Sequence, residues 1–278
     1  DQIKSQYGVE NVNVVAHSMG GLVVKKYLND YGGDSIQKFI DIATPHLGSP
    51  SAFKTLNFGD NLGISYLFGI FNVNKERIKS ISQNMPSVYQ LLPSQNYFED
   101  ADNEYRYYVF DAVGGSDRLD FNQTSTYLKS AGRNSALVDK AQVFHQEVDG
   151  LDPATYGVTT YNIVGCGTPT LGQFYLLQGG EHPIYNVKYI NGDGTVPLKS
   201  AEAIMATSTY YVKNAQHALM PSASGVKELI AGMLTATSTS FDISLYSNLS
   251  TSASGCTIPD GKIVSFHSPL ELHVYDNS

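Results

Sequence analysis

The 278-residue sequence has no tryptophan and only two cysteines, Cys166 and Cys256. Two cysteines cannot form the disulfide framework of a small secreted domain, and neither lies in a Cys-x-x-Cys motif, so they form one bridge or none. Charged residues make up only 16% of the chain, with 26 acidic against 18 basic, which gives a net charge of −8. This acidic balance argues against nucleic-acid binding and against a polybasic membrane anchor.

Long apolar segments are also absent. No run of about 18 or more apolar residues occurs, so the sequence predicts no transmembrane helix. Hydrophobic residues nevertheless make up 42% of the chain, enough for a sizeable core in one large domain, or in a medium domain and a small one. The chain begins within a helical pattern, residues 1–7, without an initiator methionine or a signal peptide, and we expect a processed or trimmed start.

A strand, a helix and a second strand follow one another near the N-terminus. Residues 12–16 (VNVVA) form a β-branched run that is typical of a buried strand. Residues 20–31 have apolar positions at helical spacing, and residues 38–43 (KFIDIA) form a second strand pattern. A strand–helix–strand unit of this length predicts an α/β fold with a parallel sheet.

The alternation of strands and helices is interrupted over residues 51–155. This stretch contains short helical patterns and many aromatic residues. Because about a hundred residues are too many for a crossover connection, we interpret it as an inserted, mainly helical cap. Strand patterns resume at 160–165 and 209–213, and residues 226–234 form an amphipathic helix pattern.

The last part of the chain differs in composition. After residue 235, Ser and Thr become frequent, and short strand patterns occur at 241–245, 262–266 and 270–275. This tail resembles the start of a β-rich module on a secreted bacterial protein. The sequence therefore divides into a sheet core (1–50 and 156–235), a cap (51–155) and a linker with the start of a β-rich module (236–278).

The strongest chemical signal lies between the first strand and the first helix. Ala16-His17-Ser18-Met19-Gly20 has the spacing of the G-x-S-x-G nucleophile elbow, with Ala at the first position. Small residues two positions before and after Ser18 leave room for a strained turn. Ser18 then lies at the positive end of a helix, where the amide of Met19 can donate to an oxyanion. An ordinary strand-to-helix turn capped by Ser is the alternative.

A serine nucleophile of this kind needs an acid and a histidine later in the chain. Asp193 is the candidate acid, because the glycines on both sides let the backbone turn sharply, although a plain Gly-Asp turn is also open. A calcium loop fits poorly, since only Asp193 and Glu202 match the ligand pattern. His217 follows the strand pattern 209–213 and precedes a helix, which makes it the candidate base.

The other histidines have less favourable positions. His17 is adjacent to Ser18 and is expected to point away from it as a packed side chain. His46 follows the second strand and is expected in a structural turn. Four more are expected at the surface: His145, His182, His267 and His273. For His182 a place at the mouth of the site is the alternative.

Together these segments resemble the lecithin–cholesterol acyltransferase family, which includes lysosomal phospholipase A2 and plant phospholipid:diacylglycerol acyltransferases. The resemblance spans about residues 16–235 in the family's order: AHSMGG, IATPHLGSPSAFKTLNFGDNLGI, MPSVYQLLPS, GCGTPT and NGDGTVPLKSAE, then a histidine before a helix. It implies an α/β-hydrolase fold with a mostly parallel sheet, lipid acyl esters as substrates, no metal and no cofactor. The implied triad is Ser18, Asp193 and His217.

One part of the family pattern has no counterpart in the sequence. Only 17 residues precede Ser18, and they hold one helix and one strand. The family's first oxyanion-hole residue comes from a loop after an earlier strand. We therefore expect that N-terminal strands are missing, and that a separate upstream fragment of the same gene carries the second oxyanion donor.

These observations favour a secreted or cell-surface hydrolase of lipid acyl esters (a lipase, phospholipase or esterase) that forms an acyl-enzyme on Ser18 and contacts lipid interfaces transiently. Two alternatives stay open. In an acyltransferase an alcohol replaces water in the second step, and in a non-catalytic module the hydrolase scaffold only binds lipid. The aromatic stretch 58–71 suits either a lipid-facing surface or the core of the cap.

Overall fold

The computed structural model describes residues 2–59, 75–99, 109–111, 117–178, 184–235 and 241–258. The helices are α1 (Gln2–Tyr7), α2 (Met19–Tyr31), α3 (Pro50–Phe58), α5 (Lys75–Ser82), α6 (Pro86–Gln90), α7 (Phe121–Ser130), α8 (Ser135–Val148), α9 (Leu198–Ala201) and α10 (Val226–Leu234). The strands are β1 (Val12–His17), β2 (Ile36–Ile42), β3 (Val109–Asp111), β4 (Asp117–Leu119), β5 (Thr159–Cys166), β6 (Thr168–Gln178), β7 (Ile184–Gly192), β8 (Ser208–Lys213) and β9 (Leu249–Ser250). Short 3-10 helices occur at Gln95–Phe98, Pro153–Tyr156, His217–Ser222 and Ile243–Leu245.

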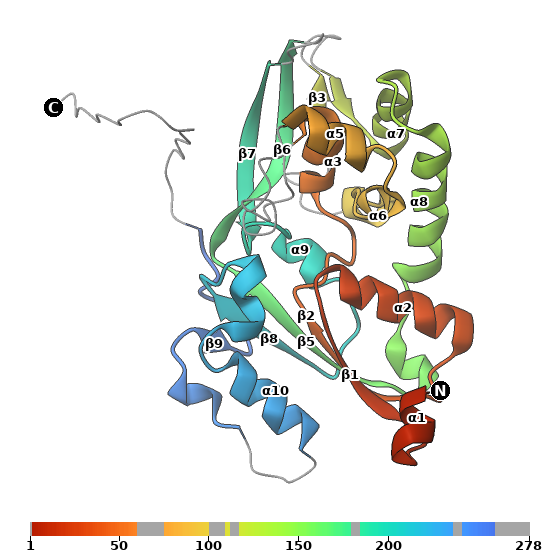
Figure 1. Cartoon of the computed structure of the whole chain (residues 1–278). Helices are drawn as coiled ribbons and strands as arrows, with labels where there is room; N and C mark the ends of the chain where they lie inside the picture. Colours follow the sequence, from red (N-terminus) through yellow and green to blue (C-terminus); the bar gives the residue numbers. More distant parts are fainter. Residues whose placement is uncertain are drawn as a thin grey trace, which may run out of the picture.

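The main sheet has five strands in the order β1-β2-β5-β8-β9. The first four run parallel, and β9 pairs antiparallel with β8. Helices α2 and α8 lie together on one side of this sheet, and α10 lies on the other (Figure 1). The predicted α/β fold with a mostly parallel sheet is confirmed.

The inner strand β2 is covered on both faces in its second half, where residues 39–42 are all buried. Phe39 packs with Leu28 of α2, whereas Ile40 and Ile42 belong to the opposite cluster with Leu229 of α10. The sheet is therefore held between helices from both ends of the described chain.

A second sheet was not predicted from the sequence. It has the strand order β4-β3-β6-β7, in which β6 and β7 form an antiparallel hairpin and β3 runs parallel to β6. Phe174 of β6 packs with Phe53 of α3, Tyr89 of α6 and Leu128 of α7 in one hydrophobic cluster. The hairpin lies outside the cap range 51–155, yet it pairs with β3 from inside that range.

Phe58 shows how the aromatic stretch of the cap is used where the structure describes it. Its ring stacks on Tyr185 of β7 at 4.1 Å between centroids and lies 6.1 Å from the Phe174 ring. Phe58 therefore contributes to the core of this part of the molecule. Residues 60–71 of the stretch lie outside the described residues.

The tail differs from its prediction at residues 241–245. The expected strand is a 3-10 turn, because the Asp242 carboxylate accepts a hydrogen bond from the Ser244 amide at 3.0 Å. The tail contributes β9 instead, and a disulfide joins Cys256 to Cys166 at the end of β5. The strands expected at 262–266 and 270–275 lie outside the described residues.

Apolar side chains are exposed around β1 and α2, at one edge of the described sheet. Val15 is 44% exposed and Val23 is 62% exposed.

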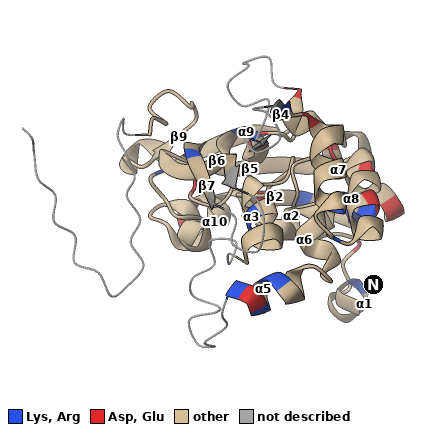
Figure 2. Cartoon of the chain, turned by 90° about the horizontal axis from the view of Figure 1, so that it is seen from above, with Lys and Arg blue, Asp and Glu red and all other residues tan. Residues whose placement is uncertain are grey.

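From above, blue and red segments mark α5, α7 and α8, while most of the central elements are tan (Figure 2). Of the helices that the structure describes, none has the length and apolar character needed to cross a bilayer.

Candidate active site

Ser18 occupies the turn between β1 and α2, with φ 57° and ψ −132°. This positive φ is strained for a residue other than glycine. Neighbouring backbone holds it, since the Ser18 amide donates to Ile42 O at 2.8 Å and the Gly21 amide donates to Ser18 O at 3.0 Å. The turn is therefore fixed from both β2 and α2.

The space around the turn is tightest at Gly21, a position that the sequence analysis did not single out. A Cβ at Gly20 would lie 3.5 Å from the Ala16 Cβ, which is an ordinary contact. A Cβ at Gly21 would lie 2.0 Å from Thr44 Oγ1, so a neighbouring group would have to shift. Only glycine fits at this second position unless Thr44 moves.

Asp193 lies in the tight loop between β7 and α9 and is almost fully buried. Its Oδ1 accepts hydrogen bonds from the amides of Thr195 at 3.0 Å and Val196 at 2.7 Å. The loop depends on Gly194, which has φ +92°. These contacts fix the carboxylate so that Oδ2 faces His217.

His217 begins the 3-10 helix that follows β8. Its amide donates to Asp193 O at 2.9 Å, and its Nδ1 lies 2.7 Å from Asp193 Oδ2. Its Nε2 lies 2.8 Å from Ser18 Oγ. With the proton on Nδ1 donated to the carboxylate, Nε2 is free to accept the hydroxyl proton of Ser18. The structure thus brings the three predicted residues together in hydrogen-bonding contact.

Met19 is the first residue of α2, so its amide belongs to the first turn, where amides have no partner within the helix. Its residue is 37% exposed. The amide therefore suits the predicted role of oxyanion donor beside Ser18.

The sequence of the chain is similar to those of known proteins. Residues 2–110 match the family model described as "Lecithin:cholesterol acyltransferase". The chain is 26% identical over 234 residues to "Phospholipase A(1) LCAT3" of Arabidopsis thaliana, covering 70% of the chain and 51% of that protein. It is 27% identical over 202 residues to "Lecithin-cholesterol acyltransferase-like 1" of the same plant, covering 71% and 43%.

Over residues 2–110 the chain is similar to the lecithin:cholesterol acyltransferase family. It spans about half the length of the curated relatives it matches. Two solved structures also align with it. The Tle4–Tli4 complex gives a TM-score of 0.49 at 17% identity, covering 73% of this chain and 53% of that chain. The mature Bacillus licheniformis lipase BlEst2 gives 0.38 at 13% identity, covering 84% and 69%.

The order of the candidate triad residues along the chain agrees with a known fold. Ser18 follows a parallel strand and begins a helix, and Asp193 and His217 follow later in the same order along the chain. This is the arrangement of the α/β-hydrolase fold. The predicted fold class is therefore confirmed.

His17 was expected to point away from the site, but it does not. Its Nε2 lies 3.0 Å from His217 O, and the two imidazole centroids are 4.8 Å apart. Burial, and then the nearby His217 ring, lower the pKa of His17. His17 is the last residue of β1, and the segment after β8 brings His217 against it, so its side chain packs against the candidate base.

His145 was expected at the surface, but it is buried. Its Nδ1 lies 2.6 Å from Asp149 Oδ1 and its Nε2 lies 2.9 Å from Gln90 O. It faces inward because this side of α8 packs against α6. His182, His267 and His273 lie outside the described residues.

His46 belongs to a buried polar cluster beneath the turn, together with Asp41 and Thr44. Its Nε2 lies 2.8 Å from Asp41 Oδ2, and burial lowers its pKa. Lys25 of α2 is buried nearby, and burial lowers its pKa to about 8. Only a structural turn was expected at His46, although a buried polar group was signalled by Asp41 within the otherwise apolar run 39–42 (FIDI).

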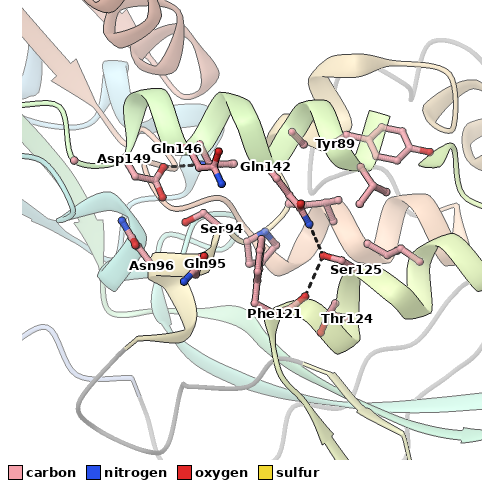
Figure 3. A pocket seen from close by; sticks show the side chains of 17 residues that line it. Tyr89, Ser94, Gln95, Asn96, Phe121, Thr124, Ser125, Gln142, Gln146 and Asp149 are labelled. Atoms are coloured by element: carbon pink, nitrogen blue, oxygen red, sulfur yellow. Dashed lines mark hydrogen bonds and ion pairs between the residues drawn. The ribbon is translucent and has the colours of Figure 1, made fainter. Parts of the chain in front are cut away.

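A cavity of about 340 Å³ lies among α7, α8 and the segment 89–96 (Figure 3). Phe121 and Leu128 give it apolar walls. Gln142 crosses it to donate to Ser125 Oγ at 2.8 Å. The residues that line this cavity do not include the predicted triad, so it is separate from the Ser18 turn.

Proposed function

We propose that this chain carries the active site of a serine hydrolase of lipid acyl esters, that is, a lipase, phospholipase or esterase. One observation supports this above all others. A line of two hydrogen-bonding contacts runs from Ser18 Oγ to His217 Nε2 at 2.8 Å, and from His217 Nδ1 to Asp193 Oδ2 at 2.7 Å. This is the arrangement that activates a serine hydroxyl.

The proposed reaction has two steps. In the first, Ser18 Oγ attacks the acyl carbonyl while His217 Nε2 takes the hydroxyl proton, and the Met19 amide donates to the resulting oxyanion. The C–O bond to the alcohol then breaks, and His217 returns the proton to that alcohol. In the second step water attacks the acyl-enzyme with His217 again as base, the bond between Ser18 Oγ and the acyl carbon breaks, and His217 returns the proton to Ser18 Oγ. Asp193 holds the imidazole in the required tautomer and stabilises its cation.

The substrate class follows from the relatives. One is named a phospholipase A(1), and the family model is named for lecithin and cholesterol. We therefore expect an acyl ester of a lipid and a transient contact with a lipid interface. An acyltransferase is the alternative, since an alcohol that reaches the acyl-enzyme in place of water would take the acyl group.

We further propose that a separate upstream fragment of the same gene covers the open edge of β1 and supplies a second oxyanion donor. Among the described strands, β1 pairs with β2 alone. A hollow of about 580 Å³ beside it is lined by apolar side chains that include Val14, Val23 and Tyr27. An uncovered strand edge with apolar neighbours is a site for strand addition.

We also propose a secreted or cell-surface location. The Cys166–Cys256 disulfide supports this, because disulfides persist in oxidising compartments. The curated relatives reported above are from a plant, so the bacterial origin stays a prediction.

A fluorophosphonate probe tests the proposed function directly, because it phosphonylates an activated serine. We expect a mass adduct on Ser18 in the full chain and none in Ser18→Ala, together with hydrolysis of a short p-nitrophenyl ester by the parent alone. Product analysis with added alcohol then separates hydrolysis from acyl transfer. A parent protein without an adduct would favour a non-catalytic lipid-binding module.

A further inference from the structure

We propose that Thr44 is a positioning residue, held by Asp41 and His46, that orients the peptide between Ser18 and Met19 and thereby aims the oxyanion-binding amide. This inference rests on the serine chemistry proposed above. It assigns a role in that chemistry to a buried cluster that lies outside the triad.

The cluster forms a continuous chain of contacts that ends at the nucleophile's backbone. His46 Nε2 lies 2.8 Å from Asp41 Oδ2, and Asp41 Oδ1 lies 2.5 Å from Thr44 Oγ1. Thr44 Oγ1 in turn donates to the carbonyl oxygen of Ser18 at 2.8 Å. Asp41, Thr44 and His46 are all fully buried.

The neutral form of His46 fits this chain. Its Nδ1 is buried without a hydrogen-bond partner among the described residues, so the ring carries its proton on Nε2 and donates it to Asp41. Thr44 has one hydroxyl hydrogen, which it shares between Asp41 Oδ1 and the Ser18 carbonyl. Asp41 thus fixes the rotation of the Thr44 hydroxyl above the turn.

The geometry of the peptide bond connects this carbonyl to the oxyanion donor. The peptide between Ser18 and Met19 is planar, so its C=O and N–H point in opposite directions within one plane. The Ser18 carbonyl accepts from two different elements, Thr44 after β2 and the Gly21 amide of α2. Fixing the carbonyl on both sides fixes the direction of the Met19 amide.

This arrangement also constrains how α2 packs against the cluster. Buried polar groups are unfavourable compared with an apolar filling unless each is hydrogen-bonded. Here the α2 backbone approaches so closely that a Cβ at Gly21 would lie 2.0 Å from Thr44 Oγ1 and 2.3 Å from Asp41 Oδ1. The close approach places the hydroxyl directly against the strained turn, which is the position that orienting the peptide requires.

The predicted kinetic effect is specific. Thr44→Val keeps the shape of the side chain and removes the hydroxyl, so the Met19 amide loses part of its aim. Complete loss of an oxyanion donor lowers kcat by about 10²–10³, so we expect a fall of about tenfold or more in kcat with KM unchanged. Thr44→Ser keeps the hydroxyl and should retain most of the activity.

The deciding experiment measures the inhibition constant of a trifluoromethyl ketone with the full chain. Ser18 Oγ adds to the ketone carbon, the carbonyl π bond becomes an oxyanion, and the serine proton moves to His217. In Thr44→Val the inhibition constant should rise by the same factor by which kcat/KM falls, while Thr44→Ser stays near the parent. A merely structural role would change the melting temperature without this proportionality.

The outcomes are distinguishable. A Thr44→Val variant with parental kcat and inhibition constant would overturn the positioning role and leave the proposed function intact. A parent without a fluorophosphonate adduct on Ser18 would overturn both. If Thr44→Val does not fold, Thr44→Ala removes the same hydroxyl in a smaller side chain, and the same proportional loss is expected; parental values in that variant would also overturn the role.

Discussion

Ser18 Oγ and His217 Nε2 lie 2.8 Å apart, although 199 positions separate them in the chain. Ser18 follows β1 and His217 follows β8, and two further strands, β2 and β5, lie between these strands in the sheet. The pair therefore depends on the register of four parallel strands. A shift of any one of them would separate the hydroxyl from the imidazole.

Asp193→Asn should leave the fold intact and abolish most of the activity. The amide cannot accept the Nδ1 proton of His217 as the carboxylate does, so the imidazole is held in the wrong tautomer, and in serine proteases the equivalent change lowers kcat by about 10⁴. Steady-state kinetics on a p-nitrophenyl ester measure this effect. Asp139→Asn, on the exposed side of α8, is the matched control and should behave as the parent.

Gly21→Ala and Gly20→Ala should have opposite effects on stability. Ala at position 21 places a methyl group 2.0 Å from Thr44 Oγ1, and such overpacking typically costs about 1–3 kcal/mol in the free energy of unfolding. Ala at position 20 meets only the Ala16 Cβ at 3.5 Å and gains helix propensity of up to about 1 kcal/mol. Urea denaturation of both variants measures the difference, and equal stabilities would contradict the account of the turn.

Reduction of the disulfide should lower the melting temperature. Cys166 and Cys256 close a loop with a sequence separation of 90, for which the chain-entropy model gives about 4–5 kcal/mol of stabilisation. Activity should also fall, because the Cys256 carbonyl accepts a hydrogen bond from the Asn191 side chain, two residues before Asp193. The same side chain accepts from the Gly167 amide at 2.7 Å, so the disulfide supports the segment that leads to Asp193. Thermal melts with and without reductant test this. A double Cys166→Ser and Cys256→Ser variant should be insensitive to reductant, and a parent equally insensitive would contradict the prediction.

The free energy of unfolding should decrease as the pH falls below about 6.5. Burial lowers the pKa of His46 from its usual value of 6.5, so in the folded protein the ring takes up a proton only at a lower pH. Between those two pH values the unfolded chain binds more protons than the folded one, and stability is lost on acidification. Above the unfolded pKa both states have a neutral ring, and this contribution is constant.

Chemical denaturation between about pH 5 and pH 8 measures this dependence. His46→Gln should show a shallower loss of stability with acid, whatever its stability at neutral pH. His17, whose pKa is also lowered by burial, contributes to the same trend, so His17→Gln is the comparison variant. An unchanged slope in His46→Gln would show that His46 does not titrate on unfolding.

The sequence was most informative for residues that lie in turns set by their immediate neighbours. Ser18 and Asp193 stand in short glycine-containing motifs whose turns are decided by neighbouring residues, and His217 stands at a strand end. The contacts among them match the expected spacing, while their catalytic roles stay a proposal. The contact of His17 with His217 was not predictable, because the two residues lie 200 positions apart in the chain.

The second sheet was missed although residues 185–189 of β7 (YNVKY) alternate between apolar and polar, because the partner strand β6 lacks such a signal. Residues 171–174 of β6 are all buried, so the expected alternation of apolar and polar residues is absent. Gly172 interrupts the pattern, since a Cβ there would lie 2.5 Å from Ile190 of the partner strand. The pairing of β6 with β3 joins segments that lie far apart in the chain, which periodicity does not report.

The β6–β7 hairpin could change in length during evolution without moving Asp193. Thr168 pairs with Gly192, so the chain leaves the neighbourhood of β5 and returns to it at adjacent positions, and Asp193 follows at once. The location of Asp193 is therefore independent of how far the hairpin extends. Paired insertions or deletions toward its tip would lengthen or shorten the second sheet while Asp193 stays in place, so lineages could remodel this region without moving the proposed acid.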